Sequence, residues 1–518
     1  MDLFLKILMI VVFFVITIYV GFYCRKKATT SNDFILGGRK LGPWLSAFAY
    51  GTSYFSAVIF IGYAGSFGWQ FGLSALWIGI GNALIGSLLA WVVLGRRTRQ
   101  VTQKMKSATM PDFFGKRYES KRIKKVASII VFIFLIPYTA ALYNGLSSLF
   151  SSAFGFDRYE VWIIIIAAIT GVYVIIGGLM STAVNSFIQG LIMLVGIIAV
   201  VIAVLNTNGG LTSSTEALAT KGWQYASIFG DKPIDLIFVI LLTSMGAWAL
   251  PQMVGKFYSI NDGKQIQKGA IISTVFALIV AGGCYFLGGF GRLFVESPTA
   301  VGGYDGIVPS MISGLPVLIV GIVIVLVLAA SMSTLASLVL TSASTIMNDI
   351  IKEARPGISE KKQMWWLRGL VVVFIVISAG IAIFQIYGPE SMAQDIASLM
   401  GVSWGAISGA FLAPFLLGLY WKRTTKAGVW ASFGTGVGIM VLYLIFVYTK
   451  ANVPAFFTNS IKMGVVSMAM GFVVVPVVSL FTKPPRKELV EDLFSAYEIE
   501  KEFSEVVSVA YEEQKNDN

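Results

Sequence analysis

The sequence predicts an all-α integral membrane protein with about thirteen transmembrane helices. Of its 518 residues, 56% are hydrophobic and only 13% are charged, and the mean hydropathy is +0.78. Several apolar runs reach the roughly 20 residues that a helix needs to cross about 30 Å of hydrocarbon. The alternating pattern of membrane barrels is missing from these runs, so the spans are expected to be helices.

Apolar windows bounded by charged, Gly and Pro residues mark the expected spans. The first is interpreted as a retained helix, because no small-residue cleavage pattern precedes Arg25. In chain order the spans lie near residues 4–23, 44–71, 73–94, 126–153, 159–177, 183–205, 235–255, 269–294, 313–347, 367–388, 393–420, 427–448 and 461–481.

Positive charge gathers in alternate loops between these spans. The basic segments are 25–40, 96–125, 256–268, 352–368, 422–426 and the tail from Lys483. By the positive-inside rule these segments are cytoplasmic, which puts the N-terminus outside and the C-terminus inside a cell (cytoplasmic) membrane. The net charge of +12 is therefore interpreted as a topology signal, with the lipid bilayer and no nucleic acid as partner.

Composition and motifs also exclude several functions. The chain has no histidine, and Cys24 and Cys284 fit neither a metal-ligand spacing nor a disulfide framework. No phosphate-binding G-x-x-x-x-G-K-[ST] motif occurs, so nothing indicates ATP-driven pumping. The longest polar pieces, 206–234 and 482–518, are too short for a catalytic domain, so no enzyme is expected. Residues 488–511 of the tail are typical of a cytoplasmic surface helix.

Three spans contain polar or helix-breaking interruptions. Residues 49–56, AYGTSYFS, concentrate hydroxyls about a third of the way through the second span, and residues 243–252, TSMGAWALPQ, place Gly246 and Pro251 midway through another. Residues 329–337, AASMSTLAS, put four hydroxyls inside a long helix. Ordinary helix packing explains one such cluster, because small and hydroxylated residues let membrane helices approach closely.

The three clusters together favour a transport site. Interrupted helices at the start of two successive five-helix sets are typical of an inverted-repeat transporter with its site near the bilayer midplane. Na⁺ prefers oxygen donors, and a broken helix frees backbone carbonyls. Ser333 and Thr334, with carbonyls around 52–55 and 330, are therefore expected to form a neutral oxygen cage.

At these residues the sequence resembles the sodium/solute symporter family, which contains the bacterial sodium/proline and sodium/pantothenate symporters. Four stretches carry the resemblance: FILGGRKLGPW at 34–44, TMPDFFGKRY at 109–118, AASMSTLAS at 329–337 and FLLGLYWKRTTKAG at 415–428. The resemblance implies a leucine-transporter-like 5+5 inverted repeat with one N-terminal and two C-terminal extra helices. The implied units are 1–43 (extra helix and cytoplasmic loop), 44–205 (first repeat), 206–234 (extracellular loop), 235–420 (second repeat), 421–481 (two extra helices) and 482–518 (cytoplasmic tail).

The resemblance also implies the site residues. The family's sodium ligands match the carbonyls of Thr52 and Phe55 and, from the later helix, Ala330, Ser333 and Thr334. The positions that match solute contacts are Ser53, Tyr54, Ser56, Tyr138 and Trp248. For Tyr138 and Trp248, aromatic packing between helices is an equal alternative.

Two departures from the family pattern concern charge. The proline-transporter pattern has an aspartate at the position of Tyr54, and the T-D-x-x-Q pattern of the sixth helix has one where this chain has Ser186. A carboxylate near a cation strengthens its binding. The departures therefore put in question the affinity and identity of the coupling ion, and they argue against a second sodium site on that carboxylate.

The sequence thus predicts a secondary active transporter that couples Na⁺ entry to uptake of a small polar organic solute by alternating access. An amino acid such as proline, or a small carboxylate such as pantothenate, is favoured, and no obligatory protein partner is evident. The alternatives are a symporter driven by another ion or a uniporter of the same fold. From another class, the alternative is a membrane sensor or channel, although no signalling domain or filter motif is present.

Overall fold

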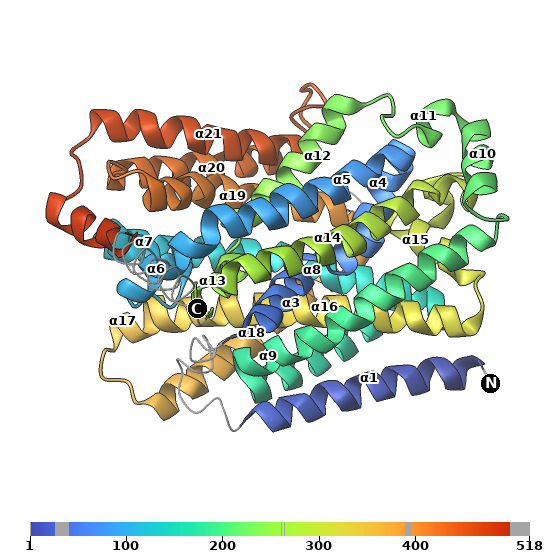
Figure 1. Ribbon diagram of the computed structural model, residues 1–518, viewed down its shortest axis with the longest axis horizontal. Helices are drawn as coiled ribbons and strands as arrows, with labels where there is room; N and C mark the ends of the chain where they lie inside the picture. Colours follow the sequence, from blue (N-terminus) through green and yellow to red (C-terminus); the bar gives the residue numbers. More distant parts are fainter. Residues whose placement is uncertain are drawn as a thin grey trace, which may run out of the picture.

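The fold is a bundle of long helices that run between two ends of the molecule (Figure 1). A computed structural model describes residues 2–25, 41–156, 158–260, 262, 263, 265–388 and 395–497. Within these residues the one β-type contact is a bridge between Leu41 and Ile260. The all-helical prediction is confirmed for this part of the chain. The loop 26–40, the start of the FILGGRKLGPW stretch, and the end of the tail lie outside the described residues.

The long helices follow the expected spans in order. They are α1 (Asp2–Arg25), α3 (Pro43–Tyr54), α4 (Ala64–Phe71), α5 (Leu76–Gly81), α8 (Lys121–Phe154), α9 (Tyr159–Asn206), α12 (Pro233–Met245), α13 (Pro251–Tyr258), α14 (Gln265–Gly289), α16 (Val317–Thr345), α18 (Glu360–Tyr387), α19 (Ile396–Tyr420), α20 (Lys426–Tyr448) and α21 (Ser460–Phe481). π-helical turns continue several of them: η2 (Val58–Tyr63), η4 (Asn82–Leu89), η5 (Trp91–Gly95) and η10 (Ile346–Ile351).

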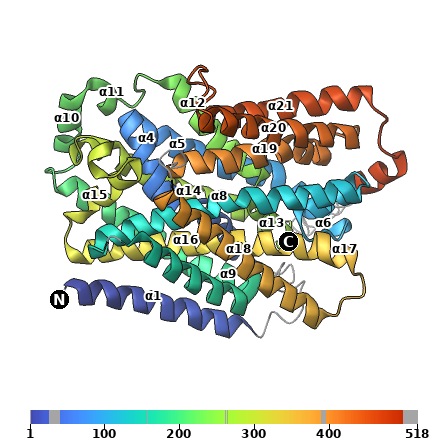
Figure 2. The same ribbon diagram turned by 180° about the vertical axis from the view of Figure 1, so that it is seen from behind.

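Short helices cap the two ends of the bundle. At one end, called here the α7 end, lie α6 (Arg96–Lys104), α7 (Met110–Arg117) and α17 (Lys352–Ala354). At the opposite end, called the α10 end, lie α10 (Leu211–Lys221), α11 (Trp223–Ala226) and α15 (Ile307–Ser313), together with the N-terminus of α1 (Figures 1 and 2). The lysine-rich segments around α6, α7 and α17 therefore share one end.

The first expected interruption is a real break in the helix. α3 ends at Tyr54, and Phe55 has extended backbone angles (φ −106°, ψ 117°). The Ser56 hydroxyl accepts a hydrogen bond from the Val58 backbone N–H at 3.3 Å, which caps the helical segment that follows. The carbonyls next to Phe55 are thus released from the i to i−4 ladder.

The chain reverses between α4 and α5 at Gly72. This residue has φ +60°, and a Cβ here would lie 2.2 Å from the Tyr225 carbonyl oxygen. Glycine satisfies both requirements, since it has no Cβ and tolerates positive φ. The reversal falls at the expected boundary between spans 44–71 and 73–94.

The second expected interruption separates α12 from α13. α12 ends at Met245 and tightens into a 3₁₀ turn, η6 (Gly246–Ala249). Leu250 is extended (φ −72°, ψ 120°), and Pro251 starts α13. The two helical parts are bent by 48°. Pro251 stands at the first helical position, where its missing N–H costs no hydrogen bond.

Within the described residues, ten helices are long and apolar enough to cross a membrane, or eleven if the bent pair is one span. The count differs from thirteen because α3 is short and because 58–104 is one nearly continuous run of helical turns, although the chain reverses within it at Gly72. The expected spans 159–177 and 183–205 likewise fall within the single helical element α9. Neither thirteen spans nor the repeat is established by these helices.

The packing puts α3 at the centre of the bundle. α3 contacts α9, α14 and α16, whereas α19, α20 and α21 form a separate layer on one side. α4 and α14 meet backbone to backbone, since a Cβ on Gly68 would lie 2.2 Å from the Gly288 carbonyl carbon. In the tail, residues 487–497 are helical. Leu493 and Phe494 in this segment belong to a small apolar cluster that also includes Met105, next to α6. The remainder of the expected tail helix lies outside the described residues.

Candidate functional site

The first break lies against the middle of α16, where the two hydroxyl clusters meet. The Thr52 and Ser333 hydroxyl oxygens are 2.7 Å apart. The Thr334 hydroxyl lies 3.1 Å from the Thr52 carbonyl oxygen and 3.1 Å from the Ala330 carbonyl oxygen. The structure therefore brings together four of the five residues expected as sodium ligands. The fifth, Phe55, is the extended residue at the end of α3.

A third helix reaches the same cluster. Ser186 on α9 places its hydroxyl 2.8 Å from the Ser333 hydroxyl. Ser186, Ser333 and Thr334 are fully buried, with at most 1% of each residue exposed. The position where the family pattern has an aspartate is thus beside the oxygen cluster, but it carries a neutral hydroxyl.

The donor set of this cluster suits a hard monovalent cation. The set is called here the cation cage, and it consists of Thr52, Ala330, Ser333 and Thr334, with Phe55 at the end of α3 as the fifth expected ligand. The atoms of this set that could bind a cation are carbonyl and hydroxyl oxygens, which hard cations prefer. No group of three or more His, Cys, Asp or Glu side chains able to hold a metal is present among the described residues. The cage is therefore unsuited to a thiolate- or imidazole-bound transition metal.

The expected solute residues of the first break have different partners. The Ser53 hydroxyl lies 2.9 Å from the Ser337 hydroxyl on α16. The Tyr54 hydroxyl donates to the Thr243 carbonyl at the end of α12 and lies 3.4 Å from Asn82 Oδ1. Tyr54 therefore connects the first break to the helix that leads into the second break.

Two expected aromatic residues approach this region from other helices. Tyr138 on α8 lies beside Ser56, and its ring centroid is 5.9 Å from that of Trp404 on α19. Trp404 in turn lies 6.1 Å from Tyr54 by ring centroids. Trp248 in η6 donates its indole N–H to the Ile85 carbonyl at 3.1 Å, so its donor is already used within the protein. The solute roles of all five residues stay predictions.

The structure adds residues that the sequence analysis missed. Trp404 packs between Tyr54 and Tyr138, and its buried indole N–H has no partner among the described residues. The buried amide nitrogen of Asn82 is also without a partner there. Trp404 stands in the run GVSWGAISG, which is rich in small residues, and this single aromatic residue in the run is the signal that points to it.

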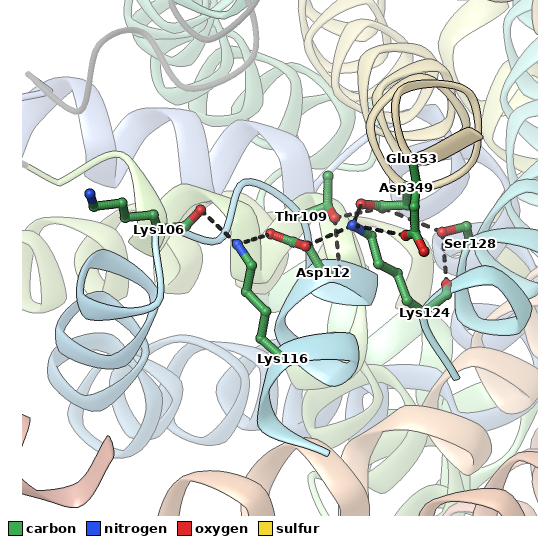
Figure 3. Close-up of polar contacts among 8 residues, drawn as sticks. All are labelled: Lys106, Thr109, Asp112, Lys116, Lys124, Ser128, Asp349 and Glu353. Carbon is green, nitrogen blue, oxygen red and sulfur yellow. Dashed lines mark hydrogen bonds and ion pairs between the residues drawn. The ribbon is translucent and has the colours of Figure 1, made fainter. Parts of the chain in front are cut away.

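An ion-pair cluster lies at the α7 end (Figure 3). Lys124 on α8 contacts three carboxylates: Asp112 at 2.9 Å, Glu353 at 3.5 Å and Asp349 at 3.6 Å. Lys116 pairs with the other oxygen of Asp112 at 2.8 Å. These five residues join α7, α8, η10 and α17. The TMPDFFGKRY stretch at 109–118 contributes to this cluster.

A buried carboxyl lies at the α10 end, next to α4, the part of the first broken helix that follows the break. Asp305 Oδ2 accepts a hydrogen bond from the Ile396 backbone N–H at 3.1 Å. Burial raises the pKa of Asp305 to about 7, and repulsion from Asp395 adds to the rise. The neighbouring Tyr304 carbonyl contacts Gly65, which has no room for a Cβ.

Comparison with known proteins agrees with this architecture. The model of the sodium:solute symporter family matches residues 34–436. The sodium/proline symporter of Staphylococcus aureus (strain JH9) is 30% identical over 516 residues, covering 96% of each chain. The osmoregulated proline transporter OpuE of Bacillus subtilis (strain 168) is 28% identical over 491 residues, covering 92% of this chain and 94% of the relative.

Solved structures support the fold. A Na⁺-coupled sialic acid symporter in a substrate-bound outward-open state aligns with a TM-score of 0.74. The alignment covers 93% of this chain and 98% of that one at 18% identity, so it supports the fold alone. A nucleobase-cation-symport-1 family transporter in a closed conformation aligns with a TM-score of 0.50 at 12% identity, covering 89% of this chain and 97% of that one.

The long apolar helices and the match to the family model define a multi-pass membrane transporter in broad outline. More specifically, the chain belongs to the sodium:solute symporter family. The predictions of a membrane location, of transport and of symport are therefore confirmed at the level of the family. The relatives described above are transporters, in agreement with the expectation that the chain is not an enzyme.

Proposed function

We propose that this protein is a Na⁺-coupled symporter that takes up a small amino acid or small carboxylate across the cell membrane. Proline is the first candidate, because relatives that match almost the whole chain are a sodium/proline symporter and a proline transporter. Pantothenate remains the candidate among small carboxylates.

One observation carries the proposal: hydroxyls and carbonyls from α3 and α16 converge at the first break, with distances between 2.7 and 3.1 Å. Na⁺ would be bound here as a transported substrate by Thr52, Phe55, Ala330, Ser333 and Thr334. Because both helices contribute ligands, the ion would hold α3 against α16 and fix the broken segment next to the solute residues.

The solute is proposed to bind on the other side of the break, among Ser53, Tyr54, Ser56, Tyr138 and Trp248. Tyr54, Tyr138 and Trp404 supply aromatic surface for an apolar ring such as that of proline. The N–H groups of Asn82 and Trp404, which have no partner among the described residues, supply hydrogen-bond donors for a polar group of the solute. Alternating access would then expose this region to either end of the bundle.

The topology is part of the proposal. The lysine-rich α7 end is assigned to the cytoplasm and the α10 end to the exterior, so the N-terminus lies outside. No obligatory protein partner is proposed.

A transport assay tests the coupling. The full chain is reconstituted in proteoliposomes, and uptake of labelled proline and of labelled pantothenate is measured with an inward Na⁺ gradient or an equal K⁺ gradient. Accumulation of one solute above its external concentration with Na⁺ alone is the expected result. Equal uptake with K⁺, or loss of uptake only when a proton gradient is dissipated, would contradict the proposal.

A second candidate is symport with another ion, or uniport. It is favoured by the hydroxyl contacts of Ser333, which already joins Thr52 and Ser186 directly, and by the absence of a carboxylate at Ser186. The K⁺ and proton-gradient arms of the same assay decide between the candidates. Single-channel currents in a planar bilayer would instead support the sensor or channel class.

A further inference from the structure

Lys256 is a buried lysine at the second break that has no acidic partner in the part of the chain that the structure describes. It lies on α13 and is 4% exposed. Its ammonium donates a hydrogen bond to the Ser337 hydroxyl at 2.9 Å. A buried charge is costly unless it is paired and hydrogen-bonded. Lys124, with three carboxylates around it, shows how this protein pairs a partly buried lysine elsewhere.

Lys256 borders a small cavity between α13, α16 and the start of α7. The cavity, called here the Lys256 cavity, has a volume of about 50 Å³. A water molecule needs roughly 10–15 Å³ of such space, so the cavity holds a few waters or one carboxylate group. Its polar lining residues are Thr109, Gln252, Lys256, Tyr258, Ser337, Thr341, Ser344 and Thr345. None of the described lining residues is acidic.

Gln252 supplies the second unsatisfied group of this cavity. It stands one helical turn before Lys256 on α13, so the two side chains share a face of the helix. Gln252 is 2% exposed, and neither its amide nitrogen nor its amide oxygen has a partner within the described residues. A lysine ammonium has three donor hydrogens and a glutamine amide has two. With one ammonium hydrogen on Ser337, up to four N–H donors remain for a ligand.

We propose that Lys256 and Gln252 form a binding site for one carboxylate group at the second break. A carboxylate would neutralise the buried ammonium and accept hydrogen bonds from both side chains. The volume admits a carboxylate group but not a whole bulky metabolite, so the rest of the ligand extends from the cavity. Two sources supply this chemistry: the carboxylate of the transported solute, which rests on the proposed function, or a cytoplasmic carboxylate that is not transported.

Contacts already described join this site to the cation cage. Ser337, which accepts from Lys256, also lies 2.9 Å from the Ser53 hydroxyl. Ser53 follows Thr52, whose carbonyl contacts Thr334. A carboxylate at Lys256 is thus separated from the cage by two hydroxyls.

Thermal unfolding of the purified full chain in detergent tests the site with two probes of similar shape. Acetate carries the negative charge and acetamide does not, and both are titrated without Na⁺ at constant ionic strength. Acetate is expected to raise the unfolding midpoint with saturation, and acetamide to leave it unchanged. Equal shifts with both probes, or no acetate shift, overturn the proposal.

Three variants assign the shift to the cavity. Lys256→Met and Gln252→Leu are each expected to raise the half-saturating acetate concentration at least tenfold. The control is Lys462→Met, because Lys462 is a partly buried lysine near the α10 end that pairs with Asp235. The control should bind acetate like the unchanged chain. If Lys256→Met does not fold, Gln252→Leu carries the test, and acetate binding unaffected by either folded variant overturns the site.

The source of the carboxylate is decided by two further arms. If the solute supplies it, proline raises the midpoint, prolinamide does not, and Lys256→Met abolishes the difference. If a non-transported carboxylate supplies it, acetate inside proteoliposomes slows Na⁺-driven uptake by the unchanged chain but not by Lys256→Met. The two proposals fail separately: an acetate shift without Na⁺-driven uptake rejects the proposed function, and uptake without an acetate shift rejects the site.

Discussion

The two helix breaks use opposite chemistry although both interrupt a helix inside an expected span. At the first break every polar partner of Thr52 and Thr334 is an oxygen, and the cluster carries no formal charge. At the second break the helix presents the ammonium of Lys256 and the amide of Gln252, which has no partner among the described residues. The first arrangement suits a cation and the second suits an anion. A break in a helix therefore provides free backbone groups for a site, and the side chains beside the break determine whether a cation or an anion fits there.

The largest expected effect comes from removing the hydroxyls of the first break. Ser333→Ala with Thr334→Ala should weaken Na⁺ binding by about a thousandfold, or about 4 kcal/mol, because each hydrogen-bond-like contact to a charge contributes ~1.5–3 kcal/mol. The measurement is the Na⁺ concentration for half-maximal uptake.

The matched control for this pair is Ser342→Ala. Ser342 is buried on the same helix, and its hydroxyl has no partner among the described residues. Its removal should leave the Na⁺ dependence unchanged. If the double variant retains the normal Na⁺ dependence, the hydroxyls of the first break do not bind Na⁺.

The next effect contrasts the partly buried Lys124 with the buried Lys256. Lys124→Met leaves three carboxylates of the ion-pair cluster close together, so the free energy of unfolding should fall by about 3 kcal/mol. Lys256→Met leaves no carboxylate without its partner. Its free energy of unfolding should therefore stay within about 1 kcal/mol of that of the unchanged chain, or rise. Thermal or denaturant unfolding in detergent measures both, with Lys116→Met, a 41% exposed lysine side chain, as the control. Similar losses for Lys124 and Lys256 would mean that Lys256 has an acidic partner.

A smaller effect is expected where the two breaks touch. Tyr54→Phe removes the hydroxyl that bonds to the Thr243 carbonyl and should lower solute affinity about tenfold, or about 1.4 kcal/mol, without changing Na⁺ affinity. The control lies one turn earlier on the same helix: Tyr50→Phe removes a hydroxyl that bonds to the Gly86 carbonyl at 2.8 Å. Solute binding measured with saturating Na⁺ distinguishes the two. Equal losses for both variants would assign Tyr54 to packing alone.

The smallest effect is a pH dependence of stability that comes from Asp305, next to α4. The folded pKa of Asp305 is raised to about 7 by burial, above its ordinary value of 3.8, so the folded chain binds more protons than the unfolded chain between these values. Stability is therefore expected to fall as pH rises toward 7 and then to level off. From pH 6 to pH 8 the loss should be about 1 kcal/mol.

Unfolding midpoints at pH 6 and pH 8 measure this loss. Asp305→Asn should remove the difference, whereas Glu296→Gln, at an exposed loop position, should keep it. A difference that persists in Asp305→Asn would assign the titration to another group.

Both breaks could be predicted from the sequence because their causes are local. Pro251 lacks an N–H, Gly246 weakens the helix, and the hydroxyls after Gly51 compete for the backbone. The pairing of Thr52 with Ser333 was also expected, but from the family resemblance and the chemistry of cations. The structure brings these side chains together, while their role as ligands stays a prediction.

Other features depend on contacts between residues far apart in the chain. Lys256 meets Ser337 across 81 positions, and Lys124 meets Asp349 across more than 200. No local pattern distinguishes a lysine in a loop from one buried at the end of a broken span, and the sequence analysis assigned Lys256 to a basic loop. The predicted number of thirteen spans is not confirmed for a different reason, since a continuous α9 and a run of π-helical turns blur the boundaries that hydropathy marks.

The hydroxyl pair Ser53 and Ser337 has a thermodynamic consequence. If an anion held by Lys256 and a cation held by Thr334 influence each other through this pair, each must raise or lower the affinity of the other by the same factor. Reciprocity of this kind needs no membrane and no gradient. Equilibrium titrations of the two ions in either order, on protein in detergent, would therefore measure the coupling free energy between the two sites.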